Sequence, residues 1–428
     1  MRAMFRVRGQ VAAAVLAAVT VVAAGEPAQE EKAGRKGPLA GLPSAPGAHL
    51  EKIKALGDNQ WLNLGSPAPD PKWGKARGRS WGARMPYAPE LKAAFLYGEG
   101  VHSFSKPDGH YMDDLWAYDV NAHRWICVYP GGDLKNLALK VDANGFEADA
   151  DGQPIPVGQM THGYEQMAYD PDRGRFMFMP CPSVNTTVRW IERRKTWGGG
   201  VGRPLNCSPW MYNAATGKFE LLKTQGAFAG SGFGDVLEYV PSIKKVVLLR
   251  TESKVAWTYD PGANVWTKRS PQGPPPPFGM DASACLDLKR ERICVGGGYL
   301  PTAPGPNALW GYDLKADTWL DLQPKGKPCA GSNRYGPNQA IMKYDSANDA
   351  VVLFCHRPDP GPEGRGVYVY DPAANSWGEA PLALPKEIGL CPSGFYSPEL
   401  NAHFIHVAGD SEDNGVMWAY RYKQAAKK

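Results

Sequence analysis

Eight residues of this chain carry side chains that could bind a polar ligand if the fold brought them together. They are His162, Glu165, Trp190, Asp235, Arg250, Asp281, Arg334 and His356. Carboxylate, guanidinium and imidazole groups exchange hydrogen bonds with hydroxyl groups, and an indole ring stacks on flat ligands or cations. Together they would suit a polar ligand such as a sugar. The competing interpretation is that these groups satisfy loop backbone atoms and one another.

Signals for a metal or a cofactor are weak by comparison. The sequence has no Cys-x-x-Cys pair and no His-Glu-x-x-His motif, which are signatures of bound zinc. Residues 410–415 resemble the start of a calcium loop, but the position of its closing glutamate holds Arg421. The glycine-rich run 198–202 is not followed by a helix pattern, which argues against a phosphate loop. We therefore predict neither a metal site nor a cofactor.

The elements that must position the eight residues are strands, because the chain repeats an aromatic hairpin five times. In each copy a tyrosine, with another aromatic two residues before it, is followed seven residues later by Trp or Phe. The pairs are Tyr118–Trp125, Tyr212–Phe219, Tyr259–Trp266, Tyr312–Trp319 and Tyr370–Trp377. Aromatics at i and i+2 share one face of a strand, and the Asp or Asn after each tyrosine starts a turn. The pattern predicts a tight antiparallel hairpin.

A second repeat precedes each hairpin. Its six copies begin at Tyr87, Tyr169, Tyr239, Leu286, Tyr344 and Tyr396. In each copy a short turn leads into a hydrophobic strand, as 170–174 leads into 176–179. Two successive hairpins give four strands, which is the unit of a propeller blade. The sequence predicts an all-β fold, a six-bladed β-propeller with four strands per blade, over residues 58–428.

The two ends of this region are predicted to share the sixth blade. Residues 417–420 continue that blade as a third strand, but position 427 holds Lys where the repeat requires an aromatic. Near the N-terminus, residues 59–64 have the pattern of a fourth strand with no third strand before it. Joining the two completes the blade and covers its edge. We therefore expect residues 61–64 to pair with 417–422.

These combined repeats resemble the kelch repeat and the central domain of galactose oxidase. The resemblance covers roughly residues 58 to 422 and rests on the aromatic-x-Tyr-Asp hairpins, the spaced Trp and the glycines at 296–298. It implies a kelch-type propeller, a fold that hosts many functions. The resemblance to galactose oxidase would imply a copper radical site that includes a Tyr-His pair. This chain contains no Tyr-His dipeptide, so that activity is not expected.

A second group in the same fold family offers a different activity. Kelch-type sialic acid mutarotases are exported six-bladed propellers, and a resemblance to them implies acid–base chemistry by a carboxylate and an arginine. On that basis Glu165 with Arg250 or Arg334 would be the reacting groups. No motif of that group matches this chain residue by residue.

Loop lengths predict which end of the propeller carries the function. Links between strands 1 and 2 and between strands 3 and 4 are short, whereas the others are long and include the insertions 131–160 and 181–208. In an up-and-down blade these two sets lie on opposite faces, and long loops on a rigid scaffold commonly form binding sites. We expect the eight candidate residues to gather around the central depression of the long-loop face. Trp190, close to the basic run 193–195, could cover a ligand there.

This organisation predicts a noncatalytic binding module for a glycan or a protein partner. The alternatives left open are a carbohydrate mutarotase or isomerase and a structural scaffold at the cell envelope. A net charge of +5 over 428 residues does not indicate a nucleic-acid partner. We expect the protein to be a monomer.

The N-terminus has the pattern of a secretory signal peptide over residues 1–24. Arg2, Arg6 and Arg8 precede an apolar run of 14 residues, 11–24, which is shorter than the about 20 residues of a membrane span. Residues 25–57 are rich in Pro, Gly, Ala and charge, and are predicted to be a flexible linker. We therefore expect a secreted or periplasmic protein with no transmembrane segment after cleavage.

Export would allow disulfides among the eight cysteines. Cys285 and Cys294 flank a turn symmetrically and are predicted to face each other across two strands. Cys181 and Cys207 bracket the second insertion and could close it with a bridge. Buried free thiols are the alternative for each pair.

Overall fold

The computed structural model of the protein describes residues 34–79, 84–98, 112–132, 140–141, 147–149, 151–156, 163–179, 209–221, 235–250, 255–274, 276, 282–297, 309–326, 340–356, 365–379, 381–389, 392–408 and 414–425. All of them belong to one compact unit, Gly34–Lys428. The other unit, Met1–Ala33, contains the predicted signal peptide and lies outside the described residues. No helix in the described ranges is long and apolar enough to cross a membrane.

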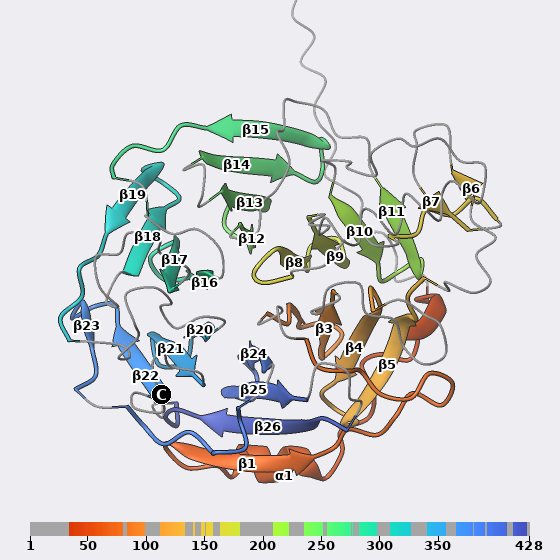
Figure 1. The fold of residues 1–428 in the computed structure, drawn as a ribbon, viewed down its shortest axis with the longest axis horizontal. Coiled ribbons are helices and arrows are strands. Elements are labelled where there is room, and N and C mark those ends of the chain that lie inside the picture. The colour runs from red at the N-terminus through yellow and green to blue at the C-terminus, as the bar shows by residue number, and fades with distance from the viewer. Residues whose placement is uncertain are drawn as a thin grey trace, which may run out of the picture. The chain divides into compact units, whose positions relative to one another are not determined.

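The Gly34–Lys428 unit is a ring of six antiparallel sheets around a central channel (Figure 1), each with four strands. Blade 1 holds β2 (Tyr87–Ala88), β3 (Ala93–Tyr97), β4 (Leu115–Asp119) and β5 (Arg124–Tyr129). Blade 2 holds β8 (Met167–Asp170), β9 (Arg175–Phe178), β10 (Trp210–Asn213) and β11 (Lys218–Leu221). Blade 3 holds β12 (Val236–Val240), β13 (Lys245–Arg250), β14 (Val255–Asp260) and β15 (Val265–Arg269).

The remaining three blades complete the ring. Blade 4 holds β16 (Ala282–Asp287), β17 (Arg292–Gly297), β18 (Leu309–Asp313) and β19 (Thr318–Asp321). Blade 5 holds β20 (Ile341–Asp345), β21 (Ala350–Cys355), β22 (Gly366–Asp371) and β23 (Ser376–Trp377). Blade 6 holds β24 (Ser393–Ser397), β25 (Ala402–Val407), β26 (Val416–Arg421) and, from the N-terminal side, β1 (Gln60–Gly65). A separate two-stranded ribbon, β6 (Lys140–Val141) with β7 (Glu147–Ala148), follows blade 1. The predicted all-β propeller of six blades with four strands each is confirmed.

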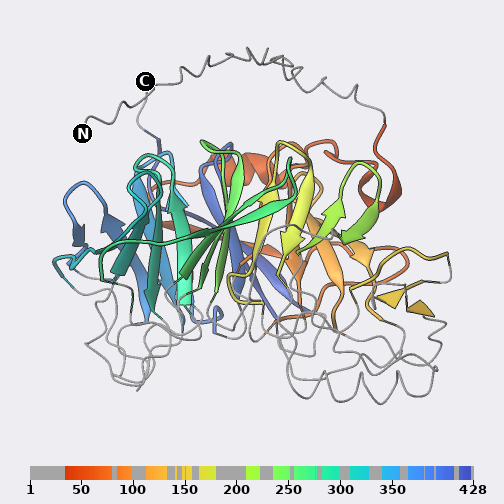
Figure 2. The same cartoon turned by 90° about the horizontal axis from the view of Figure 1, so that it is seen from above.

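The short turns of every blade gather on one face of the ring, which we call the short-turn face (Figure 2). They connect the first strand to the second in every blade, and the third to the fourth in blades 1 to 5, as predicted. The opposite end of the strands is where the long links begin, and we call it the long-loop face. Much of its chain lies outside the described ranges.

The spacing of seven residues produces an aromatic pair across the outer two strands of a blade. Tyr118 is opposite Trp125 in the β4–β5 register, and the same pairing recurs in blades 2 to 5. The ring centroids of the five pairs are 5.0 to 5.5 Å apart. Aromatic pairs at such separations contribute about 0.5–1.5 kcal/mol beyond their buried area. The repeat is therefore a packing device that the blades share.

A second device fixes the turns. Five residues after a repeat tyrosine, the backbone has a left-handed φ, and that residue's side chain bonds the tyrosine hydroxyl. The pairs are Tyr118–His123, Tyr259–Asn264, Tyr312–Asp317, Tyr344–Asp349, Tyr370–Asn375 and Tyr396–Asn401, with φ from +45° to +56° at the second residue. Asn, Asp and His are the side chains that most readily adopt this conformation. Turn geometry and strand packing are thus locked together.

The same device confirms the predicted closure of the ring. Strand β1 pairs with β26 in the register Trp61↔Tyr420 and Leu62↔Ala419. The hydroxyl of Tyr420 donates to Oδ1 of Asn59 over 3.1 Å, and Asn59 has φ 54°. The bond that other blades make within one hairpin is here made between the two ends of the propeller.

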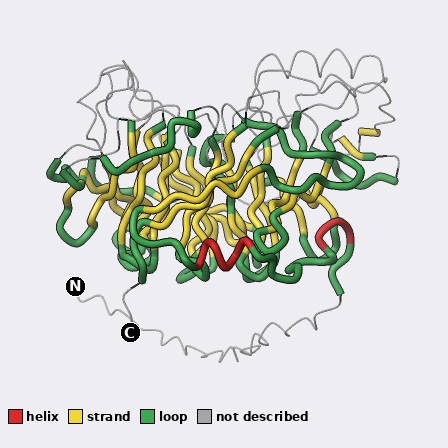
Figure 3. Tube along the Cα trace, turned by 90° about the horizontal axis from the view of Figure 1, so that it is seen from below, coloured by secondary structure: helices red, strands yellow, loops and turns green. Residues whose placement is uncertain are grey.

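Residues 34–57 lie in the range predicted to be a flexible linker, yet they pack on the ring. They form η1 (Gly37–Leu39) and α1 (His49–Lys54), with α1 near β1 at the outer edge of the ring in Figure 1 and the helices drawn in red in Figure 3. Leu39 and Ile53 are fully buried in the cores of the adjoining blades. The few leucines and isoleucines of this stretch cover apolar surface left open by the blades. The average composition of residues 25–57 is dominated by Pro, Gly and charged residues, so it does not reveal these few apolar side chains.

His123 occupies the turn position that holds Asn or Asp in the other five hairpins. This histidine should make the stability of the protein sensitive to acid. Burial, and then repulsion from His49, lower the pKa of His123 to about 4, and the two rings are 5.4 Å apart. The neutral imidazole is therefore favoured in the folded state, and stability is lost as pH falls from the unfolded value of about 6.5 towards 4.

We expect His123→Asn to remove this loss, since asparagine serves the same turn position in three other blades. Between pH 7 and pH 5 the native protein should lose about 1–2 kcal/mol more than the variant, after allowance for partial exposure. Urea unfolding at both pH values measures the difference. Parallel pH curves for the two proteins would show that His123 does not titrate on unfolding.

Candidate functional site

All six blades contribute to one cavity of about 260 Å³ in the central channel. Its wall contains the residue just before each repeat tyrosine or leucine on the inner strand. These residues are Pro86, Ala168, Glu238, Cys285, Lys343 and Phe395. Three consecutive blades therefore present a carboxylate, a thiol and an amine to the same space. The volume is near the lower end of small-molecule pockets, which range from about 300 to 1,000 Å³.

The cavity lies towards the short-turn face. Its wall includes Pro171, Pro241, Leu288 and Pro398, which belong to turns between first and second strands. The expected ligand site was the depression at the opposite, long-loop face. Because most of that face lies outside the described ranges, its role stays a prediction, and the cavity at the other end is a separate site.

Arg84 holds the inner strands together beneath the cavity. It precedes β2, and its side chain is 7% exposed. The guanidinium donates to the carbonyl oxygens of Met167 at 3.2 Å, Leu237 at 2.5 Å and Ala284 at 3.4 Å, and so contacts blades 2, 3 and 4. It also forms ion pairs with Glu165 and Glu238. Burial lowers the pKa of Arg84, but the two carboxylates outweigh it and leave the pKa raised.

Glu238 and Lys343 are two of the buried ionisable groups in the cavity wall. Their side chains are 17% and 11% exposed, and both contribute to its wall. Burial raises the pKa of Glu238, opposed by Arg84, and burial lowers the pKa of Lys343, opposed mainly by Glu165. The two pKa values therefore move towards each other and towards pH 7. Shifted pKa values of this kind occur both in groups that transfer protons and in structural ion-pair networks.

Lys343 lacks a hydrogen-bond partner among the described residues, although its Nζ atom is buried. The ion partner given for it is Oε1 of Glu165, at 4.0 Å. An ammonium group carries three donors, and leaving buried donors unsatisfied is costly. A ligand acceptor in the cavity, or loss of the proton, would remove that cost.

Of the eight residues predicted from sequence, the structure describes four. Glu165, named with Arg250 or Arg334 as a possible reacting pair, is 1% exposed and pairs with Arg84. Arg250 instead pairs with Asp235 at 3.3 Å, within blade 3. The physical reason is register: Asp235 immediately precedes β12 and lies opposite the end of β13. His356 is buried, with 5% exposure, after β21. The other four, His162, Trp190, Asp281 and Arg334, lie outside the described ranges.

Sequence reasoning missed Arg84, Glu238 and Lys343. A usable signal existed for the last two. In the six aligned inner strands the residue before the tyrosine or leucine is otherwise Pro86, Ala168, Cys285 or Phe395. A charge at that position, inside a strand surrounded by other blades, breaks the pattern. Arg84 belongs to no repeat, so nothing in the repeat alignment identifies it.

Cys285 and Cys294 are directly opposite in the β16–β17 register, as predicted, but both are free cysteines. Directly opposed residues in antiparallel strands have Cβ atoms about 4.5–5.5 Å apart, wider than the about 3.5–4.5 Å of a disulfide. The predicted bridge is therefore absent from the structure. Burial raises the pKa of the Cys285 thiol. Cys181 and Cys207 lie outside the described ranges.

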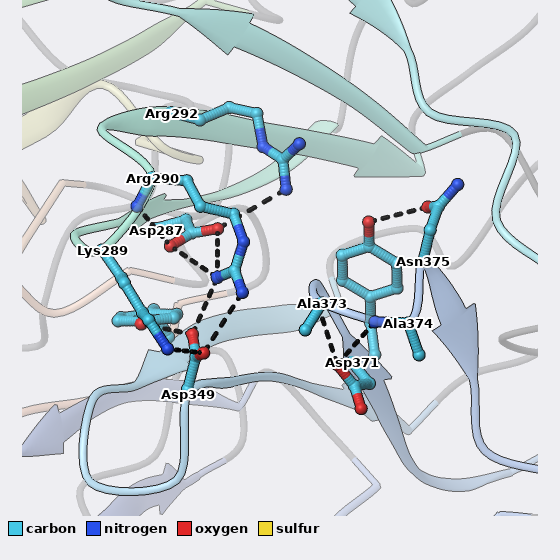
Figure 4. Close-up of polar contacts among 11 residues, drawn as sticks. Asp287, Lys289, Arg290, Arg292, Asp349, Asp371, Ala373, Ala374 and Asn375 are labelled. Atoms are coloured by element: carbon cyan, nitrogen blue, oxygen red, sulfur yellow. Dashed lines mark hydrogen bonds and ion pairs between the residues drawn. The ribbon is translucent and has the colours of Figure 1, made fainter.

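An ion network on the short-turn face joins blades 4 and 5 (Figure 4). Arg290 lies between Asp287, at 3.2 Å, and Asp349, at 2.7 Å, and Lys289 also contacts Asp349 at 2.5 Å. Hydrogen bonding from Arg290 holds the pKa of Asp349 well below its ordinary value. Each charged group in this network already forms an ion pair with another member, which indicates that the network links the two blades structurally. In the described part of the chain, no group of three or more His, Cys, Asp or Glu could hold a metal ion.

Comparisons with known proteins add little to this geometry. No family model matches the chain, and no curated protein matches it. Among solved structures, one titled "Structure of YjhT" is similar, with a TM-score of 0.44 and 12% sequence identity. The match covers 82% of this chain and 95% of that chain.

Proposed function

We propose that this protein binds a small, neutral, polyhydroxylated ligand such as a monosaccharide in the central cavity. The observation that carries the proposal is the cavity wall itself, where Glu238 and Lys343 project from the inner strands of blades 3 and 5. The carboxylate accepts hydrogen bonds and the amine donates them, which is the combination that sugar hydroxyl groups satisfy. The cavity's charges balance, since Arg84 offsets Glu165, and Glu238 and Lys343 offset each other whether both are ionised or both are neutral. A neutral ligand is therefore favoured over an ion.

This proposal retains the predicted binding role and places it at a new site. The leader pattern at residues 1–24 supports action outside the cytoplasm, in a secreted or periplasmic setting. A protein or glycan partner on the long-loop face remains a second proposal, supported by its long insertions.

Carbohydrate isomerisation by acid–base catalysis is the second candidate function. It is favoured by the opposed pKa shifts of Glu238 and Lys343 in one cavity. Exchange of sugar anomers needs an acid at the ring oxygen and a base at the anomeric hydroxyl. A protonated Glu238 and a neutral Lys343 would supply both. Anomer exchange measured by NMR, with and without the protein, tests this function separately from binding.

The binding proposal predicts a specific loss in Glu238→Gln. A panel of neutral monosaccharides and their methyl glycosides should give saturation-transfer signals with the native protein. For the best ligand, we expect affinity measured by calorimetry to fall about ten- to a hundredfold in the variant, because a charged hydrogen bond contributes about 1.5–3 kcal/mol.

Glu387→Gln is the matched control, since Glu387 is exposed and does not line the cavity. Thermal unfolding of both variants separates a binding loss from unfolding, because Glu238 also contacts Arg84. Equal affinities in the native protein and both variants would exclude the cavity as the site.

A further inference from the structure

We propose that Lys343 is a nucleophile that forms a covalent imine with a carbonyl group of a ligand in the central cavity. This inference rests on the proposed ligand site and names a ligand class for it: open-chain aldoses, ketoses and other small carbonyl compounds. A binding module without this chemistry would hold the same sugars reversibly and noncovalently.

The position of the amine carries the inference. Lys343 lies on β20, where its side chain contributes to the cavity wall. Its buried Nζ atom has no hydrogen-bond partner in the described residues, and its ion partner Glu165 is 4.0 Å away. Glu165 is meanwhile engaged by Arg84. A buried ammonium in this position is poorly compensated, whereas a neutral amine retains a lone pair that is available for attack.

The surrounding charges agree with a neutral amine. Burial lowers the pKa of Lys343 and the nearby Arg84 lowers it further, while Glu165, Glu238 and Cys285 act in the opposite direction with a smaller total effect. Exposed lysines behave differently. Lys315 is 81% exposed and pairs with Glu291 at 2.6 Å, and this hydrogen bond raises its pKa. Lys343 should therefore be the more reactive amine at neutral pH.

Glu238 can donate and accept the protons that the reaction transfers. The amine lone pair attacks the carbonyl carbon, the C–N bond forms, and the carbonyl oxygen takes a proton from the carboxylic acid of Glu238. The nitrogen returns a proton to the Glu238 carboxylate, giving a neutral carbinolamine. The hydroxyl then leaves as water with that proton, so that the C–O bond breaks and the C=N bond forms as an iminium, whose N–H proton returns to the Glu238 carboxylate and leaves the imine. The balance is one amine and one carbonyl converted to one imine and one water, with Glu238 regenerated.

The test is reductive trapping on the native full-length chain. We would incubate the protein at neutral pH with a low concentration of D-glyceraldehyde and cyanoborohydride, and map the modified lysines by peptide mass spectrometry. Reduction fixes the imine as a secondary amine that is heavier by one probe molecule less one oxygen atom. Occupancy at Lys343 is compared with Lys315 in the same sample, so no variant needs to fold.

We expect Lys343 to be labelled severalfold more than Lys315, because its lowered pKa leaves a larger fraction of neutral amine, whereas the pKa of Lys315 is raised. Glu238→Gln should slow labelling of Lys343 and leave Lys315 unchanged. Labelling of Lys343 at or below the level of Lys315 would overturn the inference.

A methyl glycoside, which has no free carbonyl, separates this inference from the binding proposal. If methyl glycosides bind and protect Lys343 from glyceraldehyde, both proposals stand. If methyl glycosides bind but Lys343 is not labelled, binding stands and the imine is rejected. If Lys343 is labelled while no sugar or glycoside binds, the imine stands for small carbonyl compounds and the proposed sugar site is wrong.

Discussion

Replacing Arg84 with methionine is expected to be among the most destabilising single substitutions in this protein. The guanidinium bonds to carbonyl oxygens of three blades and pairs with Glu165 and Glu238. Its removal leaves two buried carboxylates close together without a counter-charge. Breaking a buried pair in this way costs about 3–5 kcal/mol. Denaturant unfolding of the native and Arg84→Met proteins at pH 7 measures the loss.

A combined variant separates the ionic effect from the loss of backbone bonds. When Arg84→Met is accompanied by Glu165→Gln and Glu238→Gln, no buried charge is left uncompensated. We expect the combined variant to recover about half of the stability lost in Arg84→Met, because neutral groups are far cheaper to bury than ions. If Arg84→Met unfolds at the same denaturant concentration as the native protein, Arg84 does not hold the blades together.

Removal of the closing strand should have a still larger effect. A chain that begins at Gly65 lacks nearly all of β1 and exposes the edge of β26. It loses four of the five paired positions of the ladder. It also loses Trp61, whose ring is 4.5 Å from that of Tyr420 and whose indole donates to the carbonyl of Ala383. At about 1 kcal/mol for each hydrogen bond, the loss is several kcal/mol. We expect no single cooperative thermal transition in calorimetry.

A chain that begins at Asp58 provides the control for this truncation. It also lacks η1 and α1, but it keeps β1 and the bond between Asn59 and Tyr420. We expect it to melt cooperatively at a lower temperature, owing to the lost burial of Leu39 and Ile53. If the two shortened chains behave alike, closure by β1 contributes little and the packing of the N-terminal segment is the dominant effect.

The fold was predictable from sequence because the aromatic pairs and turns that build it lie within single hairpins and recur along the chain. Each tyrosine followed seven residues later by Trp or Phe indicates one hairpin, and the six copies of the inner repeat indicate six blades. Even the closure followed from counting strands, although its partners, Trp61 and Tyr420, are far apart in sequence. The packing of residues 34–57 was not predictable, because it depends on which apolar surface the assembled blades leave uncovered.

The candidate site was predictable only in part. Glu165 was identified because it breaks the pattern at the start of an inner strand, but its ion pair with Arg84 was not foreseen. Arg84, Glu238 and Lys343 come from three different blades and meet only when the ring has closed. The spacing of residues along one strand does not tell which side chains of the other blades lie opposite that strand across the channel. A charge at the position before the repeat tyrosine is the signal that the chain does offer.

A crystal structure with the tightest-binding sugar of the panel tests the central proposal most directly. The ligand should lie in the cavity, with a hydroxyl or carbonyl oxygen within about 3.2 Å of both Glu238 and Lys343. Density continuous with Nζ of Lys343 would in addition show the imine. A sugar bound at the long-loop face, or bound with no contact to Glu238 or Lys343, would contradict the account.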